Sequence, residues 1–536
     1  MAVELPVDAP PDALVRASAQ KIGISPAAIL GLRIARRSLD ARRRGGRPVL
    51  KFVHHVDLEL DESVSQSVVD AAVARGHARE IPPPAHFARD GVADARRSQR
   101  IVVVGAGPAG LYAAWTLAAN GVSVDVIDRG PGLRDRGRAL ARFDRTRELD
   151  PERNLLFGEG GAGTYSDGKL YTRTQHALEG PIVRTLIEAG APEALAYDAR
   201  AHVGTDQLHR VLPRLRARLE AMGVRFHFDT RLDALTTPEP GRITAIATSD
   251  GGIECDGVVL ALGHSARDTL RRLHADGLVA EAKPFQLGLR VEHPQALIDE
   301  GRFGVDADIA KLGHAYYTLV ANNRDAPSLH SFCMCPGGQI VAAVAQPGLL
   351  CTNGMSNSRH SSPYANSGLV VTMGPREYGD GVFAGVEFQE RLEARFFEAG
   401  GGDYAVPAQR VDDFIEGRER SEVGRTSYRL GTTPTRIDRL LPEAMTAAMR
   451  AGLRAFDRTI PGYASEHGVL VGVESRSSGP VRLPRDPETR LATGFANLWP
   501  VGEGAGYAGG IMSAAIDGAR TAWAVLGLKE SDASRP

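Results

Sequence analysis

The strongest chemical signal in the chain is the hexapeptide GAGPAG at residues 105–110. Its G-x-G-x-x-G spacing stands between an apolar run at residues 101–104, typical of a buried strand, and an apolar helical pattern. In such a turn Gly105 permits a tight bend, Gly107 lets the backbone approach a pyrophosphate, and Gly110 lets the helix pack closely on the strand. With Pro108 and Ala109 completing the turn, the sequence predicts a dinucleotide site at a helix N-terminus.

A carboxylate follows where this kind of site needs one. Asp128 comes directly after the second predicted strand, residues 123–127, and 23 positions after Gly105. At that place an acidic side chain binds the ribose hydroxyls of an adenosine. We therefore assign Asp128, with its neighbour Arg129, to the predicted cofactor-binding residues.

A second glycine-rich turn, VGEGAGYAGGI at residues 501–511, precedes a helical pattern over about 512–526. It resembles the second flavin-binding motif of two-dinucleotide-fold flavoproteins, in which a Gly-Asp pair places a carboxylate on the ribityl hydroxyls. Here Gly502 is followed by Glu503 instead. The resemblance implies that the helix N-terminus, at Gly510, Ile511 and Met512, faces the pyrimidine edge of a flavin. A helix dipole there favours the negative charge of the reduced ring.

Two further segments are assigned to the same site. The strand VVLALG, ending at Gly263, resembles the short Ala-Thr-Gly strand of such proteins, with Leu262 in place of the threonine. The stretch FGEGGAGTYSDGK, residues 157–169, has neither a buried strand before it nor a helical pattern after it. We interpret it as a loop whose backbone approaches the cofactor at Gly160 and Gly161. Lys169 either holds a substrate anion or reduced-flavin charge, or is an ordinary surface lysine.

Other candidate catalytic residues are few. Cys333 and Cys335 would share one face of an extended strand. They are either a redox dithiol or two small core residues, and the second interpretation is favoured because an i,i+2 disulfide is strained. Residues 353–368, rich in Asn and Ser and containing His360, either line a polar substrate pocket or form a loop. The absence of H-E-x-x-H and paired C-x-x-C spacings predicts no metal site.

These residues need a divided scaffold to bring them together. The pattern predicts an α/β protein: a small N-terminal α/β domain over 1–85, a linker over 86–99, and a Rossmann-like FAD-binding domain built from 100–270 and 481–530. An inserted α+β substrate domain occupies 271–480. Within the first domain we expect a helix over about 12–23, another opening at Ser25-Pro26, and a strand over 49–60. Within the FAD domain an amphipathic helix is expected over 207–222.

The N-terminal region also contains an Arg-rich stretch, residues 33–48, which we interpret as a basic loop. Its seven arginines, from Arg33 to Arg47, either hold RNA, a phosphate or an acidic partner, or form a solvated surface. The solvated surface is favoured, because no aromatic residue is interleaved to stack on bases. The net charge of −1 gives no overall attraction to nucleic acid, so a nucleic-acid partner is not the favoured expectation.

Composition places the protein in a broad class. The 536 residues include 60 glycines, 43% hydrophobic residues and only four cysteines, which excludes a disordered chain and a disulfide scaffold. The N-terminus lacks the pattern of a signal peptide, and no charge-free apolar run reaches about 18 residues. We therefore expect a cytoplasmic protein without a membrane span.

Five more segments complete a family resemblance that covers most of the chain: HVGTDQL (202–208), GLRVEHPQ (288–295), SFCMCPGG (331–338), NGMSNSRHSSPYANSG (353–368) and GVESRSSGPVRL (472–483). Together with the glycine turns they resemble the bacterial family of uncharacterised FAD-dependent dehydrogenases, also described as NAD(P)/FAD-dependent oxidoreductases. The resemblance implies a glutathione-reductase-like FAD fold and bound FAD, but no particular substrate.

The expected function is an oxidoreductase in which hydride passes through flavin N5 to or from an unidentified small molecule. NAD(P)H is a candidate transient electron donor, although the sequence contains only one convincing dinucleotide motif. Two alternatives stay open: an RNA-associated flavoprotein that docks nucleic acid through Arg33–Arg47, and a non-enzymatic redox sensor that holds FAD. The sequence does not indicate an oligomeric state.

Overall fold

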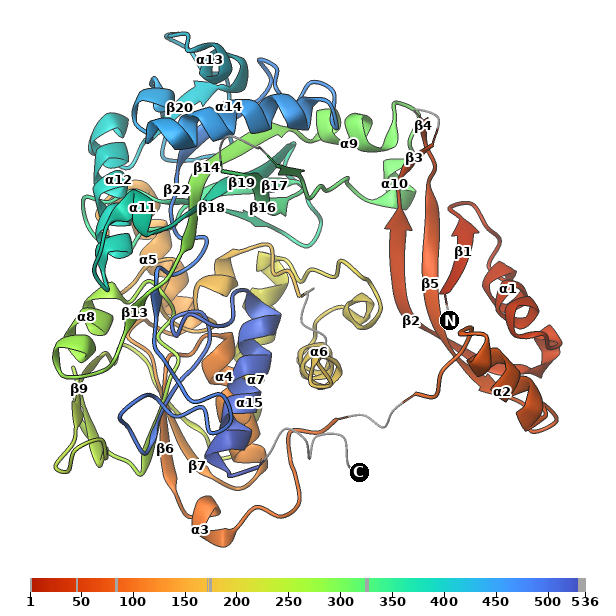
Figure 1. Cartoon of the computed structure of the whole chain (residues 1–536), viewed down its shortest axis with the longest axis horizontal. Coiled ribbons are helices and arrows are strands. Elements are labelled where there is room, and N and C mark those ends of the chain that lie inside the picture. The colour runs from red at the N-terminus through yellow and green to blue at the C-terminus, as the bar shows by residue number, and fades with distance from the viewer. Residues whose placement is uncertain are drawn as a thin grey trace.

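The computed structural model describes residues 2–44, 47–81, 85–170, 172, 176–322 and 327–528. The fold is mixed α/β, as predicted, and it contains a parallel sheet of five strands. Figure 1 shows the N-terminal sheet standing at one side of a larger body. That body carries the parallel sheet at one end and a larger, mostly antiparallel sheet at the other.

The N-terminal unit is an antiparallel sheet of order β1-β5-β2 with two helices. Its elements are β1 (Ala2–Pro6), α1 (Ala13–Ile22), β2 (Ile29–Asp40), β5 (Lys51–Leu60) and α2 (Gln66–Ala74). Ser25-Pro26 opens only a single 3₁₀ turn, Pro26–Ala28, rather than a second helix. The predicted linker over 86–99 contains the short helix α3 (Asp94–Arg97).

The interpretation of residues 33–48 as a loop is wrong. Strand β2 continues to Asp40 in register with β5, and the two-residue strands β3 (Arg43–Arg44) and β4 (Arg47–Pro48) follow it. Leu32 and Ile34 pack against the small N-terminal core, so the alternation of apolar and basic residues is that of a half-exposed strand. Pairing along most of its length with β5 outweighs the polar composition that favoured a loop.

The parallel sheet has the order β24-β12-β6-β7-β8. Its strands are β6 (Arg100–Val104), β7 (Ser123–Ile127), β8 (Arg225–His227), β12 (Gly257–Leu260) and β24 (Leu498–Pro500). Both faces are covered. On one face Ile101 and Val103 join the core formed with α4 (Pro108–Ala119), α7 (Thr205–Ala221) and α15 (Ile511–Val525). On the other, Val102 and Val104 join a core with the three-stranded sheet of β9 (Leu232–Thr236), β10 (Ala245–Thr248) and β11 (Gly251–Glu254).

The parallel sheet joins segments that are far apart in the chain. β24 pairs with β12, and α15 packs along α4 in the same layer (Figure 1). The glycine turns that precede α4 and α15 are therefore placed at the same end of the sheet. This arrangement agrees with an FAD-binding unit assembled from two stretches of sequence, although the exact domain boundaries remain our proposal.

The second sheet carries seven strands in the order β15-β16-β19-β14-β22-β20-β21. They are β14 (Phe285–Pro294), β15 (Val320–Ala321), β16 (Leu329–Cys335), β19 (Tyr364–Met373), β20 (Val406–Arg410), β21 (Thr432–Pro434) and β22 (Val469–Glu474). Helices α9 (Gln295–Phe303), α12 (Ala384–Gly400), α13 (Val411–Glu416) and α14 (Glu443–Asp457) contact it, as does the hairpin β17 (Gly338–Ala342)–β18 (Thr352–Ser356). Strand β16 and this hairpin bring polar side chains to the site described below.

The other elements are connecting or peripheral. They are α5 (Leu133–Thr146), α6 (Glu179–Glu188), α8 (Arg267–Ala275), α10 (Ile309–Leu312), α11 (Pro375–Tyr378), β13 (Glu281–Ala282) and β23 (Val481–Arg482). No helix among the described residues combines the length and apolarity needed to cross a bilayer.

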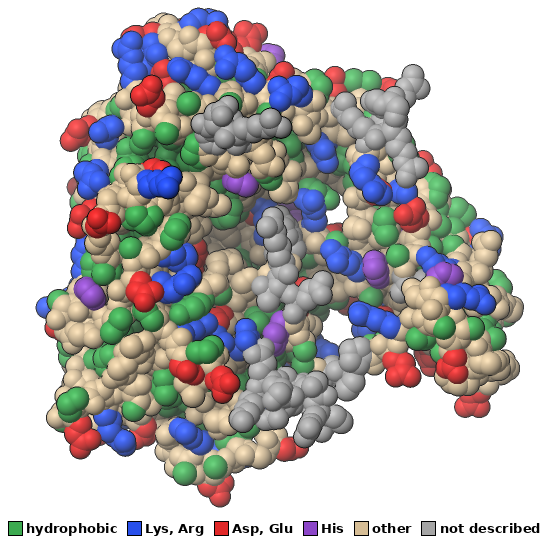
Figure 2. All heavy atoms as spheres, in the orientation of Figure 1, with side chains coloured by type: hydrophobic (Ala, Val, Ile, Leu, Met, Phe, Trp, Pro, Cys, Tyr) green, Lys and Arg blue, Asp and Glu red, His purple; other side chains and the backbone are tan. Residues whose placement is uncertain are grey.

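Charged side chains of both signs share the surface. Figure 2 shows Lys and Arg side chains interspersed with Asp and Glu over the described part of this face, on the N-terminal sheet as well as on the larger body. This mixture agrees with the near-zero net charge of the chain. A surface of interspersed charges gives little long-range attraction to a polyanion.

Candidate functional site

A cavity of about 720 Å³ opens at the carboxyl end of the parallel sheet. Loops after β6, β7, β12 and β24 surround it, which is where open α/β sheets bind ligands. Twelve of the predicted cofactor-binding residues line it: Gly105, Gly107, Pro108, Ala109, Asp128, Arg129, Gly161, Gly263, Gly502, Glu503, Gly510 and Ile511. The candidate catalytic residues Lys169 and Cys333 line it as well.

The three glycines of the first turn meet different surroundings. Gly105 has φ +111°, and an added Cβ would lie 2.3 Å from the Ala261 oxygen. A Cβ on Gly110 would lie 1.9 Å from the Gly105 oxygen, so the close packing of α4 on the turn requires glycine. Gly107 has an ordinary φ of −78°, and its Cβ would have only the Gly161 Cα, at 3.8 Å, as a neighbour. Gly107 therefore leaves open space, and this cradle fits a pyrophosphate at the N-terminus of α4.

The predicted residues outside the cavity lining have packing roles. Gly160 would place a Cβ 2.3 Å from Thr164 Oγ1, and Met512 is buried in the core around α15. Gly110 packs as described above, and Cys335 is fully buried. These four residues pack beneath the cavity lining and do not form part of it.

Asp128 holds three backbone segments together. Its carboxylate accepts hydrogen bonds from the N–H groups of Ala106 (2.8 Å), Gly130 (2.9 Å) and Gly158 (2.8 Å). Burial raises the pKa of Asp128, although these hydrogen bonds favour the ionised form. Asp128, the residue predicted to bind the ribose, thus also ties the first glycine turn at Ala106 to the loop of residues 157–169 at Gly158.

Arg129 is fixed by two carboxylates. Its guanidinium pairs with Glu152 at 2.6 Å and Asp268 at 2.7 Å, and lies 4.4 Å from the centre of the Phe157 ring. Burial disfavours the charged form, but the hydrogen bonds with Asp268 and Glu152 outweigh it and raise the pKa of Arg129. The side chain is a rigid, charged part of the cavity wall.

Glu503 and His264 lie on the cavity wall, with His264 Nδ1 3.7 Å from Glu503 Oε2. Burial raises the pKa of Glu503 to about 7, against the opposing effect of the Lys283 charge. Burial, with the charges of Arg476 and Arg267, lowers the pKa of His264 to about 3. Burial thus favours the protonated form of Glu503 and the neutral form of His264, relative to the same groups in water.

Lys169 and Cys333 line another part of the cavity, and Cys335 is buried beside them. Lys169 Nζ lies 3.8 Å from Cys333 Sγ, 3.9 Å from Cys335 Sγ and 2.9 Å from Asp167 Oδ2. Pairing of β16 with β19 is irregular between Phe332 and Cys335, and Cys333 has φ +46°. Hydrogen bonding from Cys335 and the charge of Lys169 lower the pKa of the Cys333 thiol to about 5, whereas that of Cys335 is raised. Lys169 is half-buried within this cluster rather than an ordinary surface lysine.

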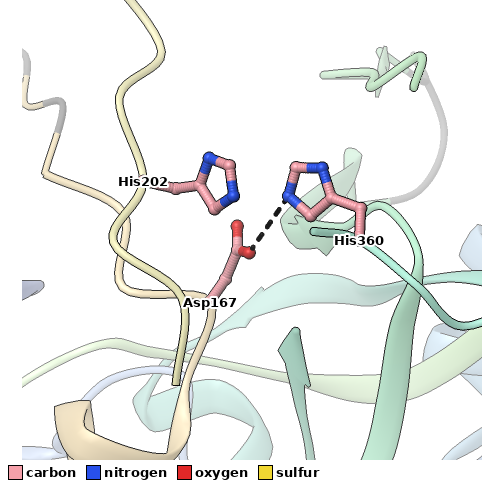
Figure 3. Close-up of side chains that lie close together, drawn as sticks. All are labelled: Asp167, His202 and His360. Atoms are coloured by element: carbon pink, nitrogen blue, oxygen red, sulfur yellow. Dashed lines mark ion pairs between the residues drawn. The ribbon is translucent and has the colours of Figure 1, made fainter. Parts of the chain in front are cut away.

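One cluster at the edge of the cavity was not predicted from the sequence. Asp167, His202 and His360 bring their potential ligand atoms within 4.8 Å of one another (Figure 3). Burial raises the pKa of Asp167, but Lys169, His202 and Ser356 outweigh it, and the net pKa is lowered. Burial and His202 lower the pKa of His360 to about 4. The available signal was the presence of these residues in three family-like motifs, but no sequence spacing indicates that they meet.

Further polar lining residues come from the seven-stranded sheet, the β17–β18 hairpin and the segment after β22. They include Gln286, Asn353, Thr372, Arg476, Ser477 and Ser478. Among them Asn353 belongs to the stretch 353–368 that the sequence suggested as a possible pocket lining. The described arginines of the N-terminal unit do not reach the cavity lining. Arg33 pairs with Asp57, Arg37 with Asp198, and Arg42 with Asp40. Gly45, Gly46 and the side chains of Arg43, Arg44 and Arg47 lie outside the described residues.

Three family models match parts of the chain. Residues 284–477 match the model described as FAD-dependent protein, C-terminal domain-like, and residues 103–140 match the NAD(P)-binding Rossmann-like domain. Residues 1–57 match a domain of unknown function, DUF8436. The second of these matches contains the turn that was assigned to dinucleotide binding.

One protein resembles the chain over nearly its full length, and another resembles part of it. An uncharacterised protein of Clostridium beijerinckii is 37% identical over 524 residues, covering 97% of each chain. Kynurenine 3-monooxygenase of Salinispora arenicola is 31% identical over 200 residues, covering 34% of this chain and 40% of that protein.

Two solved structures match the chain at low identity. Glycine oxidase from Bacillus cereus gives a TM-score of 0.33 at 11% identity, covering 81% of this chain and 98% of that one. A geranylgeranyl bacteriochlorophyll reductase-like protein from Thermoplasma acidophilum gives 0.35 at 13% identity, covering 82% and 80%. The full-length relative and the matching domains identify the family independently of these structures. The chain therefore belongs to the bacterial family of FAD-dependent oxidoreductases that its motifs indicated, and FAD is its cofactor.

Proposed function

We propose that the protein is a dehydrogenase or reductase that moves a hydride between flavin N5 and a small-molecule substrate. The observation that carries the proposal is the cavity that runs from the first glycine turn to the wall of Lys169 and Cys333. Its volume is in the range of pockets that enclose small molecules and cofactors. The cavity therefore offers room for FAD at the glycine turns and for a substrate beside Lys169.

Each part of the lining has a proposed role. The turn at Gly107 and the N-terminus of α4 hold the pyrophosphate, and Asp128 faces the ribose. Glu503 holds the ribityl chain, and the N-terminus of α15 stabilises negative charge on the pyrimidine edge. Bound FAD supplies the redox chemistry, while Lys169 orients an anionic or carbonyl oxygen of the substrate.

Reduced nicotinamide is proposed as a transient donor. The chain contains one dinucleotide motif of the predicted type, and FAD occupies it in our proposal. NADH or NADPH would therefore bind on the part of the cavity formed by the inserted domain, for which we propose the boundaries 271–480. This arrangement predicts weak nicotinamide binding without a second Rossmann turn.

The test is a flavin spectrum followed by anaerobic titration. Purified protein is expected to show flavin absorbance, and addition of NADH, NADPH or a small-molecule donor is expected to bleach it. Reoxidation by oxygen or another acceptor completes the cycle. A flavin that stays oxidised with every donor would refute an enzymatic role and favour the redox-sensor alternative. A protein that cannot be reconstituted with FAD would refute the assignment of the cavity.

A further inference from the structure

We propose that Asp167, His202 and His360 bind a divalent transition-metal ion at the edge of the flavin cavity. The three side chains come from separate segments: the loop after Gly163, the segment before α7, and the connection between β18 and β19. Asp167 also lines the cavity, so a bound ion would lie beside the space proposed for the substrate. The proposal does not depend on the flavin reaction, because metal binding is measured directly.

The side chains converge on one point. Figure 3 shows each imidazole turning a ring nitrogen toward the Asp167 carboxylate. His360 Nε2 lies 3.9 Å from Asp167 Oδ1, and the ring centroids of His202 and His360 are 4.0 Å apart. Around an ion with metal–ligand bonds of about 2.1 Å, neighbouring ligand atoms stand roughly 3–3.5 Å apart. Side-chain rotations that move the ligand atoms by about 1 Å would complete the coordination.

The nitrogens of this cluster lack other partners. Nε2 of His202 and Nε2 of His360 are both inaccessible to solvent and make no hydrogen bond in the described part of the chain. A buried polar atom without a partner is costly, and both rings have one at the same place. A metal ion would satisfy both nitrogens and the carboxylate at once.

The carboxylate is already oriented for this role. Ser356 donates a hydrogen bond to Asp167 Oδ1, and Lys169 pairs with Oδ2 at 2.9 Å. Such outer contacts commonly fix the direction of a ligating carboxylate. The Lys169 charge disfavours weakly held cations, so binding depends on the two imidazoles. Two nitrogen ligands and one carboxylate suit Zn²⁺, Fe²⁺ or Co²⁺ better than Mg²⁺ or Ca²⁺.

The two histidine-bearing loops are held together independently of any ion. A Cβ on Gly204 would lie 2.3 Å from the Ser358 nitrogen, so the loops touch at a glycine. Asp206 accepts hydrogen bonds from Ser358 N (2.6 Å) and Ser358 Oγ (2.7 Å). His360 has φ +51°, an unusual conformation for a residue other than glycine, and such strain concentrates at functional sites.

The experiment measures metal binding by the full-length FAD-containing protein. After chelator treatment, Co²⁺ and Zn²⁺ are titrated by equilibrium dialysis, with Co²⁺ absorption as a second readout. We expect one equivalent of either ion, and His202→Gln and His360→Gln should each weaken binding by at least about tenfold. His467→Gln is the matched control, because His467 is exposed and lies outside the cluster. It should bind as the unaltered protein does.

A second control separates the cluster from the nearby thiols. The double variant Cys333→Ser, Cys335→Ser should still bind one equivalent, and bound Co²⁺ should lack an intense thiolate charge-transfer band. Loss of binding in this variant, with retention in both histidine variants, would overturn the proposal. Absence of stoichiometric binding by the unaltered protein would do so as well. The FAD content of each variant shows whether it has folded. If a variant does not fold, metal binding by the unaltered protein still decides the proposal.

Discussion

Replacing Gly107 with valine should remove FAD binding while leaving the protein folded. Gly107 has φ −78°, which valine adopts readily, and the only atom near an added Cβ is the Gly161 Cα at 3.8 Å. The valine side chain would project into the space between two glycine loops. In our proposal that space holds the pyrophosphate, so the substitution blocks the ligand rather than the fold.

The size of the effect follows from the hydrogen bonds that the substitution removes. Displacing the pyrophosphate from the turn breaks about two hydrogen bonds between backbone N–H groups and a charged phosphate. Such bonds contribute about 1.5–3 kcal/mol each, so FAD binding should weaken by about 3–6 kcal/mol. This corresponds to roughly 10²- to 10⁴-fold weaker FAD binding. Gly107→Ala, with a single methyl group, should have a smaller effect.

The assay is fluorescence titration of apoprotein with FAD, with circular dichroism as the measure of folding. Gly110→Val is the matched control, because its Cβ would lie 1.9 Å from the Gly105 oxygen and 3.2 Å from Val103 Cγ1. That variant should lose stability as well as FAD. Unaltered FAD affinity in Gly107→Val, or unfolding of Gly107→Val to the same degree as Gly110→Val, would show that the cavity is assigned wrongly.

Three further outcomes are expected. Glu393→Gln should lower the free energy of unfolding, measured in urea, by about 3–5 kcal/mol. Glu393 is fully buried between Arg267 and Arg476, and its replacement leaves two buried guanidinium charges without their carboxylate partner. A decrease below about 1 kcal/mol would contradict this reasoning. Alkylation of Cys333 by iodoacetamide should stay fast down to about pH 5, because the lowered pKa keeps its thiol ionised above that pH. Cys335→Ala removes the hydrogen bond from Cys335 and should shift the pH dependence of alkylation to higher pH. An unchanged pH dependence would show that this hydrogen bond does not lower the pKa of Cys333. Gel-shift assays at low salt should show no binding of tRNA, because Arg33, Arg37 and Arg42 of the N-terminal unit are paired with carboxylates. Binding that weakens as salt is added would instead support the RNA-associated alternative.

Local sequence patterns predicted the elements that line the proposed FAD site. The glycine-rich segment 105–110 connects β6 to α4 and includes the first residues of α4, and the helix expected over 512–526 is observed over Ile511–Val525. The amphipathic helix expected over 207–222 is observed over Thr205–Ala221. These features are predictable because glycine turns, caps and apolar periodicity act over a few neighbouring residues.

Features that depend on distant pairing were not predictable in this way. β14 lies between β19 and β22, which come much later in the chain, and no local pattern specifies that order. The Arg-rich stretch of β2 was mistaken for a loop for the same reason, because its strand conformation depends on β5. The meeting of Asp167, His202 and His360 also requires the tertiary fold.

The position of β24 and α15 has a consequence for how the protein is made. The parallel sheet lacks one of its two outer strands until residues 498–500 are available, and α4 lacks the helix it packs along until residues 511–525 follow. Contacts between segments this distant in sequence form slowly, and they cannot form on the ribosome before the last tenth of the chain emerges. FAD should therefore enter only after translation is nearly complete. A ribosome-bound chain stalled before Leu498 should acquire its N-terminal sheet yet take up no flavin.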